Sequence, residues 1–134
     1  MFRIQRVTVA LVVVLVVFHG LQPRAHATGI HGDAILGHWQ RGAGEAIIDI
    51  RRQADRYHGV VVASERHPEI VGTEIFKSLR YDTERRRWRG SVYSIARDRD
   101  FDIEMDLADP DHFVISLRIR FFRKSVQFSR QPSL

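Results

Sequence analysis

Cysteine is absent from the 134 residues of this chain. Its absence excludes disulfide bonds, a thiolate nucleophile and zinc sites built from cysteine. A bacterial lipoprotein is excluded as well, because its lipid is attached to a cysteine. Proline and glycine are sparse, at 4 and 9 residues, and they do not gather into a linker. A chain of this length without a linker predicts one domain with a modest hydrophobic core.

Long hydrophobic runs are scarce too. The apolar run at 7–18 falls short of the roughly 20 residues that a membrane-spanning helix needs. Two arginines precede this run, and residues 25–27 form a small-x-small cleavage site, Ala-His-Ala. This order predicts a secretory signal peptide over 1–27 that is cleaved after Ala27. We therefore expect a periplasmic or secreted protein without a stable membrane anchor after cleavage.

The charge of the chain is moderately basic, with a formal net charge of +5 at pH 7. Arg3, Arg6 and Arg24 belong to the predicted signal peptide, so cleavage removes much of this excess. Arg3 and Arg6 are not adjacent, which argues against export by the twin-arginine route. The charge that remains is weak evidence for nucleic-acid binding, and export argues against it further. We expect no nucleic-acid partner.

After residue 27 the hydrophobic period is close to two almost everywhere, and a helical turn is expected only at 33–36. Polar turns divide the alternating stretches into consecutive hairpins. Because closure of a sheet removes its exposed edges, we predict an all-β fold, a small up-and-down antiparallel barrel of about seven or eight strands. The barrel should occupy 35–130, after a short flexible segment at 28–34. The expected strands are 37–40, 45–52, 57–64, 73–81, 88–95, 98–107, 113–121 and 125–130.

The clearest hairpin joins 98–107 to 113–121 through an Asp-Pro-Asp turn at 109–111. Apolar side chains alternate with acids in the first strand and mainly with serine and arginine in the second. A shift of one residue in the pairing would destroy the match on both faces. The register that places Ala108 opposite His112 gives the inner pairs Met105–Ile115 and Ile103–Leu117 and the outer ion pairs Asp102–Arg118 and Asp100–Arg120.

Several segments resemble exported bacterial domains of domain-of-unknown-function family 2147. The early ones are Leu-Gly-His-Trp at 36–39, Glu-Ala-Ile-Ile-Asp-Ile at 45–50 and His-Gly-Val-Val-Val at 58–62, and the later ones are Trp-Arg-Gly-Ser-Val-Tyr at 88–93 and Val-Gln-Phe-Ser-Arg at 126–130. The resemblance extends over 35–130 and implies an exported, lipocalin-like β-barrel of unsettled activity. This chain differs from many members in lacking cysteines near the second strand and in its short loop at 65–71.

Gly37-x-Trp39 is also similar to the lipocalin signature, in which a tryptophan near the first strand closes one barrel end beneath a late arginine. The similarity implies that Arg130 or Arg120 stacks on Trp39 as a cation–π pair. Tyr93 ends the Trp-x-Gly-x-x-Tyr pattern. We take Trp39, Tyr93, Arg120 and Arg130 as candidates for binding a ligand or closing the barrel.

The remaining titratable residues do not predict a metal or catalytic site. No two histidines after residue 27 have the i, i+2 or i, i+4 spacing of a local metal site. The acids that alternate through 98–106 cannot wrap a cation from one extended row, and pairing with arginines across the strands is the favoured explanation. We expect no metal, no cofactor and no enzymatic activity.

A dense basic turn is formed by Arg85, Arg86, Arg87 and Arg89 around Trp88. Such a turn is commonly a solvated hairpin tip, but it also offers a surface for an acidic envelope protein or for phosphate groups. We take these five residues as candidates for a surface interaction.

The sequence supports two functions. The preferred one is an exported, non-enzymatic barrel that binds a small apolar or amphipathic molecule at its open end. The alternative is a barrel filled by its own side chains, including Phe101, Met105, Phe113 and Phe121, which acts as a protein-interaction or inhibitor module in the cell envelope.

Overall fold

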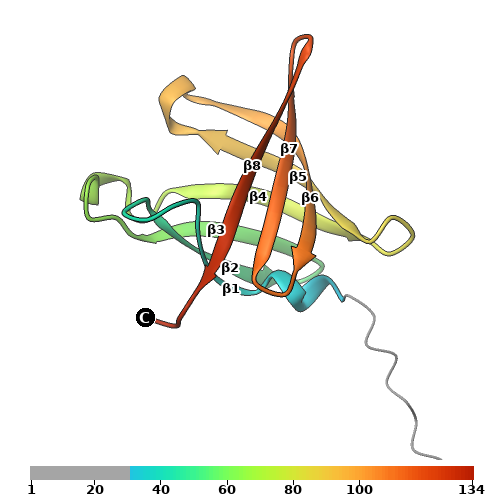
Figure 1. The fold of residues 1–134 in the computed structure, drawn as a ribbon, viewed down its shortest axis with the longest axis horizontal. Coiled ribbons are helices and arrows are strands. Elements are labelled where there is room, and N and C mark those ends of the chain that lie inside the picture. The colour runs from blue at the N-terminus through green and yellow to red at the C-terminus, as the bar shows by residue number, and fades with distance from the viewer. Residues whose placement is uncertain (1–30) are drawn as a thin grey trace, which may run out of the picture.

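The computed structural model describes residues 31–134, so the predicted signal peptide lies outside the described residues. Its eight antiparallel strands form a closed barrel in which each strand pairs with the next and β8 pairs with β1 (Figure 1). The predicted all-β barrel is therefore confirmed. The strands are β1 (Gly37–Gln40), β2 (Ile47–Gln53), β3 (Arg56–Ala63), β4 (Glu74–Asp82), β5 (Arg87–Ser94), β6 (Arg99–Asp109), β7 (His112–Ile119) and β8 (Phe122–Gln131).

Three short 3₁₀ helices complete the described chain: η1 (Gly32–Ile35), η2 (Pro68–Ile70) and η3 (Ile95–Arg97). Over residues 31–134, no helix has the length and apolar character needed to cross a membrane. The helical turn expected at 33–36 corresponds to η1. Within the segment 28–34, which was expected to be flexible, residues 32–34 belong to this helix, and residues 28–30 lie outside the described residues.

The alternating pattern of β6 and β7 produces the predicted inner face. Ile103 lies opposite Leu117 and Met105 lies opposite Ile115, as expected, and all four side chains are buried. The register shifts between Leu107 and Asp109, so that Asp109 rather than Ala108 faces His112. The extra residue allows the carboxylate of Asp109 to accept a hydrogen bond from the backbone N–H of Asp111 at 2.8 Å, which closes the turn.

The outer face of β6 differs from the prediction. No ion pair within residues 31–134 joins Asp102 to Arg118 or Asp100 to Arg120, because the β6–β7 pairing ends at Ile103 and Leu117 and does not extend to them. The acids of β6 instead pair with cations of β4 and β5. Asp100 binds Lys77 at 2.9 Å, and Arg87 binds Glu104 at 2.7 Å and Asp106 at 3.1 Å.

A bulge in β4 rearranges its inner face. Ser78 has a φ of 50°, and the pairing with β5 shifts between Lys77 and Arg80. As a result Phe76 and Leu79 are both fully buried although they are three residues apart. Gly90 of β5 lies against this bulge, where a Cβ atom would stand 2.8 Å from the carbonyl oxygen of Lys77. A side chain at position 90 would therefore push the two strands apart.

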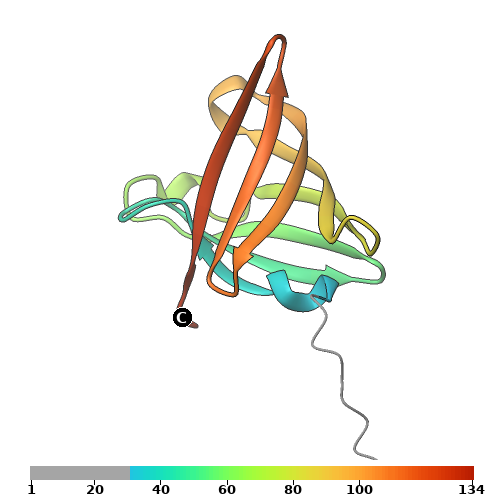
Figure 2. The ribbon, with the colours of Figure 1, turned by 45° about the vertical axis from the view of Figure 1, so that its right-hand side comes forward.

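The helix η1 plugs one end of the barrel. Ile35, at its last position, is fully buried. The indole N–H groups of Trp39 and Trp88 donate to the carbonyl oxygens of Ile35 and Gly32, at 2.8 and 3.0 Å. Figure 2 shows that the β7–β8 hairpin projects at the opposite end of the molecule. The two ends of this barrel are therefore built differently.

Aromatic side chains fill the interior next to the plug. The ring of Trp39 lies 4.5 Å from that of Phe113, which stacks on Phe128 at 4.8 Å. Phe76 meets Phe113 and Phe128 edge-on, at 5.9 and 5.6 Å. Because such rings bury large areas and pack at favourable angles, this cluster is the rigid part of the core.

Candidate functional site

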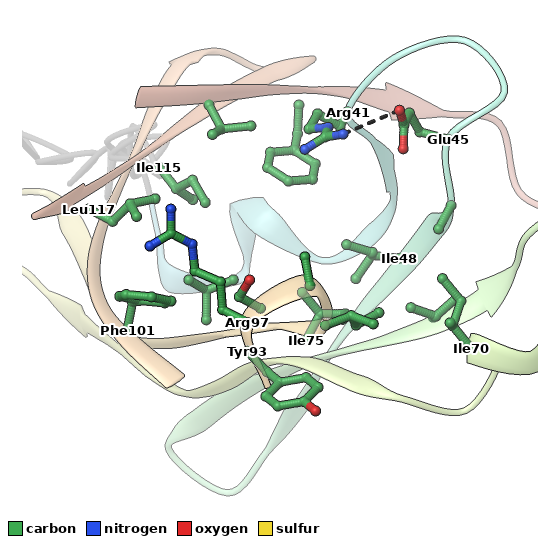
Figure 3. Close-up of a pocket in the computed structure, with 18 of the residues that line it drawn as sticks. Arg41, Glu45, Ile48, Ile70, Ile75, Tyr93, Arg97, Phe101, Ile115 and Leu117 are labelled. Carbon is green, nitrogen blue, oxygen red and sulfur yellow. Dashed lines mark hydrogen bonds and ion pairs between the residues drawn. The ribbon is translucent and has the colours of Figure 1, made fainter. Parts of the chain in front are cut away.

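The end of the barrel away from η1 is hollow. It contains an apolar pocket with a volume of about 580 Å³ (Figure 3). Side chains from most of the strands form its wall, so that the pocket is a continuation of the barrel interior beyond the aromatic cluster. The wall includes Ile48, Val61, Ile75, Val92, Phe101, Ile115, Leu117, Val126 and Phe128.

The mouth of the pocket carries charged side chains. Arg41 binds Glu45 at 3.2 Å, and these two charges neutralise each other. Arg97 lies over the ring of Phe101, with its guanidinium carbon 5.9 Å from the ring centre, and Figure 3 shows it extending across the pocket. Neither Arg97 nor Lys124 forms an ion pair with any residue in 31–134, so the mouth has an uncompensated positive charge.

The helix η2 contributes the anionic side of the mouth. Glu69 binds His67 at 3.1 Å. Its own backbone N–H lowers the pKa of Glu69 from the ordinary value, and the hydrogen bond to His67 lowers the pKa further. Glu69 therefore stays ionised to a lower pH than an ordinary glutamate does, and it leaves one side of the mouth negative.

Tyr93 lies in the wall of the pocket, where it anchors η3. Its hydroxyl donates to Asp98 at 2.5 Å, and the ammonium of Lys77 lies 4.9 Å from its ring centre. The hydrogen bond to Asp98 raises the pKa of Tyr93 above its ordinary value. Because Asp98 follows η3, this bond holds the helix that carries Arg97. Tyr93 positions the mouth of the pocket and does not close the barrel.

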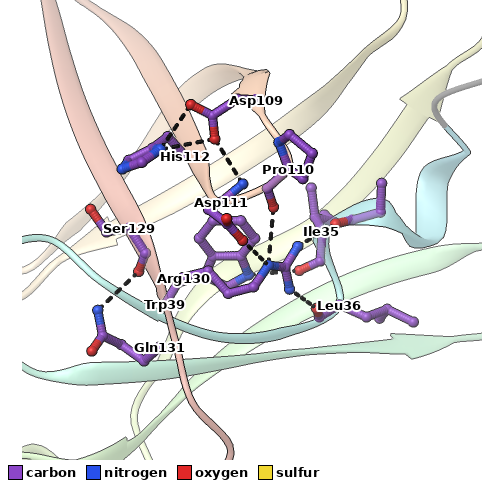
Figure 4. A network of polar contacts seen from close by, with 11 residues as sticks. Ile35, Leu36, Trp39, Asp109, Pro110, Asp111, His112, Ser129, Arg130 and Gln131 are labelled. Atoms are coloured by element: carbon purple, nitrogen blue, oxygen red, sulfur yellow. Dashed lines mark hydrogen bonds and ion pairs between the residues drawn. The ribbon is translucent and has the colours of Figure 1, made fainter.

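The stack expected at the closed end is present between Trp39 and Arg130. The guanidinium carbon of Arg130 lies 4.2 Å from the centre of the Trp39 ring (Figure 4). Its nitrogens donate to the carbonyl oxygens of Leu36 at 2.7 Å, Ala34 at 2.8 Å and Pro110 at 3.0 Å. Arg130 therefore joins the plug, the first strand and the β6–β7 turn, and its role here is structural.

Arg120 does not take part in this stack, and the prediction that it is a closing residue is wrong. It occupies the β7–β8 turn with a φ of 51°. This turn lies at the opposite end of the barrel from η1, on which Trp39 packs. The two-residue turn between Ile119 and Phe122 removes Arg120 and Phe121 from the strands to which alternation assigned them. Phe121, expected in the interior, is 98% exposed.

The basic β4–β5 turn contains a further correction. Trp88, predicted at the surface, is fully buried because it faces Tyr81 and Met105 across the two neighbouring strands. Its ring packs on that of Tyr81 at 4.8 Å. Its indole N–H donates to the carbonyl oxygen of Gly32 in η1. Trp88 therefore belongs to the closed end of the core and is not available to a partner.

The arginines of the same turn are largely paired. Arg87 and Arg89 approach Glu104 at 2.7 and 3.8 Å, and Arg85 approaches Asp82 at 3.4 Å. Two backbone N–H groups of the turn lower the pKa of Asp82, which keeps it ionised. Arg86 is exposed at the tip, with a φ of 54°. Most of the charge seen in the sequence is therefore neutralised by acids of β4 and β6.

Histidines and acids form separate pairs in this fold. His58 lies 2.6 Å from Glu74, and His112 lies 2.8 Å from Asp109. In the described part of the chain, no three His, Asp or Glu side chains gather in a way that would hold a metal ion. The residues that line the open end offer apolar contact and carry charge at the mouth.

The fold and the pocket define a small closed β-barrel that is plugged at one end and hollow at the other. Comparison of the chain with known protein families, curated proteins and solved structures found no match. The function is therefore inferred from the residues of the pocket and its mouth.

The closed end gives a prediction at alkaline pH. Tyr57 donates to Asp33 of η1 at 2.7 Å, and burial together with this bond raises the pKa of Tyr57 from 10.0 to about 12. The unfolded chain therefore loses the phenol proton at lower pH than the folded chain. We expect this contribution to stability to be complete below pH 10 and to disappear as the pH rises to about 12.

Urea denaturation across this range, on the wild type and on Tyr57→Phe, measures the effect. The phenylalanine variant should lose less stability between pH 10 and 12 than the wild type, because it has no proton to lose at position 57. An identical decline in both proteins would show that Tyr57 ionises alike in the folded and unfolded chains.

Proposed function

We propose that this protein is a non-enzymatic binding domain for a small apolar or amphipathic molecule. The observation that carries the proposal is the apolar pocket of about 580 Å³ at the hollow end of the barrel. This volume lies within the range of about 300–1,000 Å³ that is usual for small-molecule sites. The aromatic cluster and η1 give the pocket a rigid floor, which reduces the entropy that binding would cost.

The mouth favours an amphipathic molecule with an anionic head. A long apolar chain would lie against the wall formed by residues such as Ile48, Phe101 and Leu117. Its head would remain at the mouth, where the cationic side chains of Arg97 and Lys124 form no ion pair within the described chain. Charge at the rim of an apolar site fixes the orientation of the ligand while apolar burial supplies most of the affinity.

The proposed location is the periplasm or the medium. The basic start, short apolar run and Ala-His-Ala site of residues 1–27 support export. The resemblance of 35–130 to exported bacterial domains supports the same location. An exported carrier of apolar molecules would be useful where such molecules must cross an aqueous compartment.

The alternative, a filled barrel that binds an envelope protein through its basic turn, has less support. The pocket leaves part of the interior unfilled. Phe121, which was expected to help fill it, lies outside the barrel. Arg85, Arg87 and Arg89 are paired with acids of the same chain, and Trp88 is buried.

Val92 provides a direct test of the pocket. Val92→Phe places a larger side chain in the wall, whereas Val114→Phe makes the same change on the outer face of β7, away from the pocket. In a titration with the fluorescent fatty acid parinarate, we expect the wild type and Val114→Phe to bind one molecule per chain. Val92→Phe should bind about tenfold more weakly, because the ligand and the ring compete for one space.

Two further measurements complete the test. Circular dichroism should show that both variants remain folded. Arg97→Gln should weaken the binding of parinarate more than the binding of a neutral naphthylamine dye, since it removes charge from the mouth without changing the apolar wall. The proposal is wrong if the wild type binds neither probe, or if both valine variants bind parinarate as the wild type does.

A further inference from the structure

The β7–β8 hairpin ends in two exposed aromatic side chains. Phe121 is 98% exposed and Phe122 is 76% exposed. Ile119 and Phe122 are the last pair of the ladder, so Arg120 and Phe121 form the turn itself. Figures 1 and 2 show this tip projecting beyond the rest of the barrel. Two adjacent phenylalanines at a projecting point are costly to leave in water, and such a patch marks a surface that meets something apolar.

Basic side chains surround this tip. Arg118, Arg120, Arg123 and Lys124 are exposed, and none of their side chains forms an ion pair or hydrogen bond with another residue in 31–134. The sequence from 112 to 131 contains no acid. Arg118 lies directly opposite Arg123 across the hairpin, where like charges repel. This arrangement destabilises the free hairpin and would be relieved by an anionic surface.

We propose that the tip of the β7–β8 hairpin docks reversibly on an anionic phospholipid bilayer. Phe121 and Phe122 would enter the boundary between headgroups and acyl chains, where aromatic side chains are favoured. Arg118, Arg120, Arg123 and Lys124 would lie along the lipid phosphates, which attract basic side chains at the surface.

A bilayer fits this tip better than an acidic protein does. A stable protein interface buries about 1,200–2,000 Å² of surface and needs a pocket shaped for each apolar anchor. One hairpin tip offers too little area for that. A bilayer adapts its shape to the inserted side chains, so that a small apolar point with flanking cations is sufficient for peripheral binding.

Docking would also orient the pocket. Ile119 and Lys124, at the base of the tip, line the pocket. A docked barrel therefore presents its mouth toward the bilayer, where an amphipathic molecule could enter or leave without crossing water. This last step depends on the proposed ligand-binding function, whereas docking itself does not.

Vesicle co-sedimentation tests the docking. The probes are vesicles of phosphatidylcholine alone and of phosphatidylcholine mixed with phosphatidylglycerol. All proteins are purified from the same host, and intact mass verifies that they share one N-terminus, so differences report the substitutions alone. We expect the wild type to bind the mixed vesicles, to bind neutral vesicles far less, and to dissociate as salt is raised.

The aromatic contribution is measured with a double variant, Phe121→Ser with Phe122→Ser. It should bind the mixed vesicles about tenfold more weakly, because the inserted apolar area is lost. The control is Leu134→Ser, which removes a side chain that is 75% exposed at the C-terminus, away from the tip. This control should bind as the wild type does.

The charge contribution is measured with Arg120→Gln combined with Arg123→Gln. The affinity for the mixed vesicles should fall about fivefold for each arginine replaced, and binding should depend less on the salt concentration. Arg85→Gln combined with Arg86→Gln makes the same change of charge at the β4–β5 turn and should leave binding unchanged. Near-UV circular dichroism should match the wild type for every variant, because none of these side chains is in the core.

The outcomes separate docking from ligand binding. Val92→Phe should bind vesicles like the wild type, since the tip is intact. The docking proposal is overturned if the wild type does not bind the mixed vesicles at low salt, or if it binds neutral vesicles equally well. It is also overturned if the tip variants bind the mixed vesicles as tightly as the wild type does. If docking fails but the protein still binds parinarate, the proposed function stands. If docking is intact but parinarate does not bind, only the ligand-binding proposal is overturned.

Discussion

Replacing Trp39 with alanine is expected to lower the free energy of unfolding by about 3–5 kcal/mol. The side chain is fully buried, packs on Phe113 at 4.5 Å and donates its indole N–H to Ile35 at 2.8 Å. Its removal leaves a cavity between the aromatic cluster and the plug, and it deprives Arg130 of its stacking surface. Urea denaturation should show a lower midpoint with a similar slope.

Trp39→Phe is the matched variant. It retains most of the apolar volume but loses the hydrogen bond to Ile35, so a smaller loss of about 1–2 kcal/mol is expected. A Trp39→Ala protein that loses less than about 1 kcal/mol would contradict the assignment of Trp39 to the rigid floor of the barrel.

Replacing Arg130 with methionine should lower the free energy of unfolding by about 2–3 kcal/mol. The substitution removes the stack on Trp39 and the donors to the carbonyl oxygens of Ala34, Leu36 and Pro110. Arg130→Lys should recover only part of the loss, because an ammonium cannot reproduce the planar fork that reaches separate carbonyls. Urea denaturation measures both variants.

The control for Arg130 is on the same strand. Arg123→Met removes an exposed arginine that lies opposite Arg118, and it should change stability by no more than about 0.5 kcal/mol. Because Trp39 and Arg130 are in contact, the combined variant Trp39→Ala with Arg130→Met should lose less than the sum of the two single losses. Full additivity would contradict a direct stack.

The strands and much of their register were predictable because alternation is a local property. Ile103 with Leu117 and Met105 with Ile115 follow from the period of two and from the need to bury one face. The bulges at Ser78 and beside Asp109 were not predictable, because each depends on the fit between two strands and leaves little signal in either one. The expected outer ion pairs failed for a different reason: the β6–β7 pairing ends at Ile103 and Leu117, before it reaches Asp102 and Arg118.

The pocket was the least predictable feature. Whether a barrel of this size is hollow depends on where a few large side chains lie. The position of the β7–β8 turn decides whether one of them lies inside or outside the barrel. Alternation alone assigns Phe121 to the interior, but the turn places it in solvent. Trp88 shows the opposite error: its basic neighbours suggested a surface position, whereas strand pairing buries it.

Native mass spectrometry of the protein purified gently from its own host tests whether the hollow end holds a small apolar or amphipathic molecule. If it does, we expect an additional small-molecule mass on the wild type that disappears on unfolding and is reduced on Val92→Phe. A wild type that shows only the mass of the bare chain, even after incubation with excess palmitate, would contradict a ligand-holding barrel.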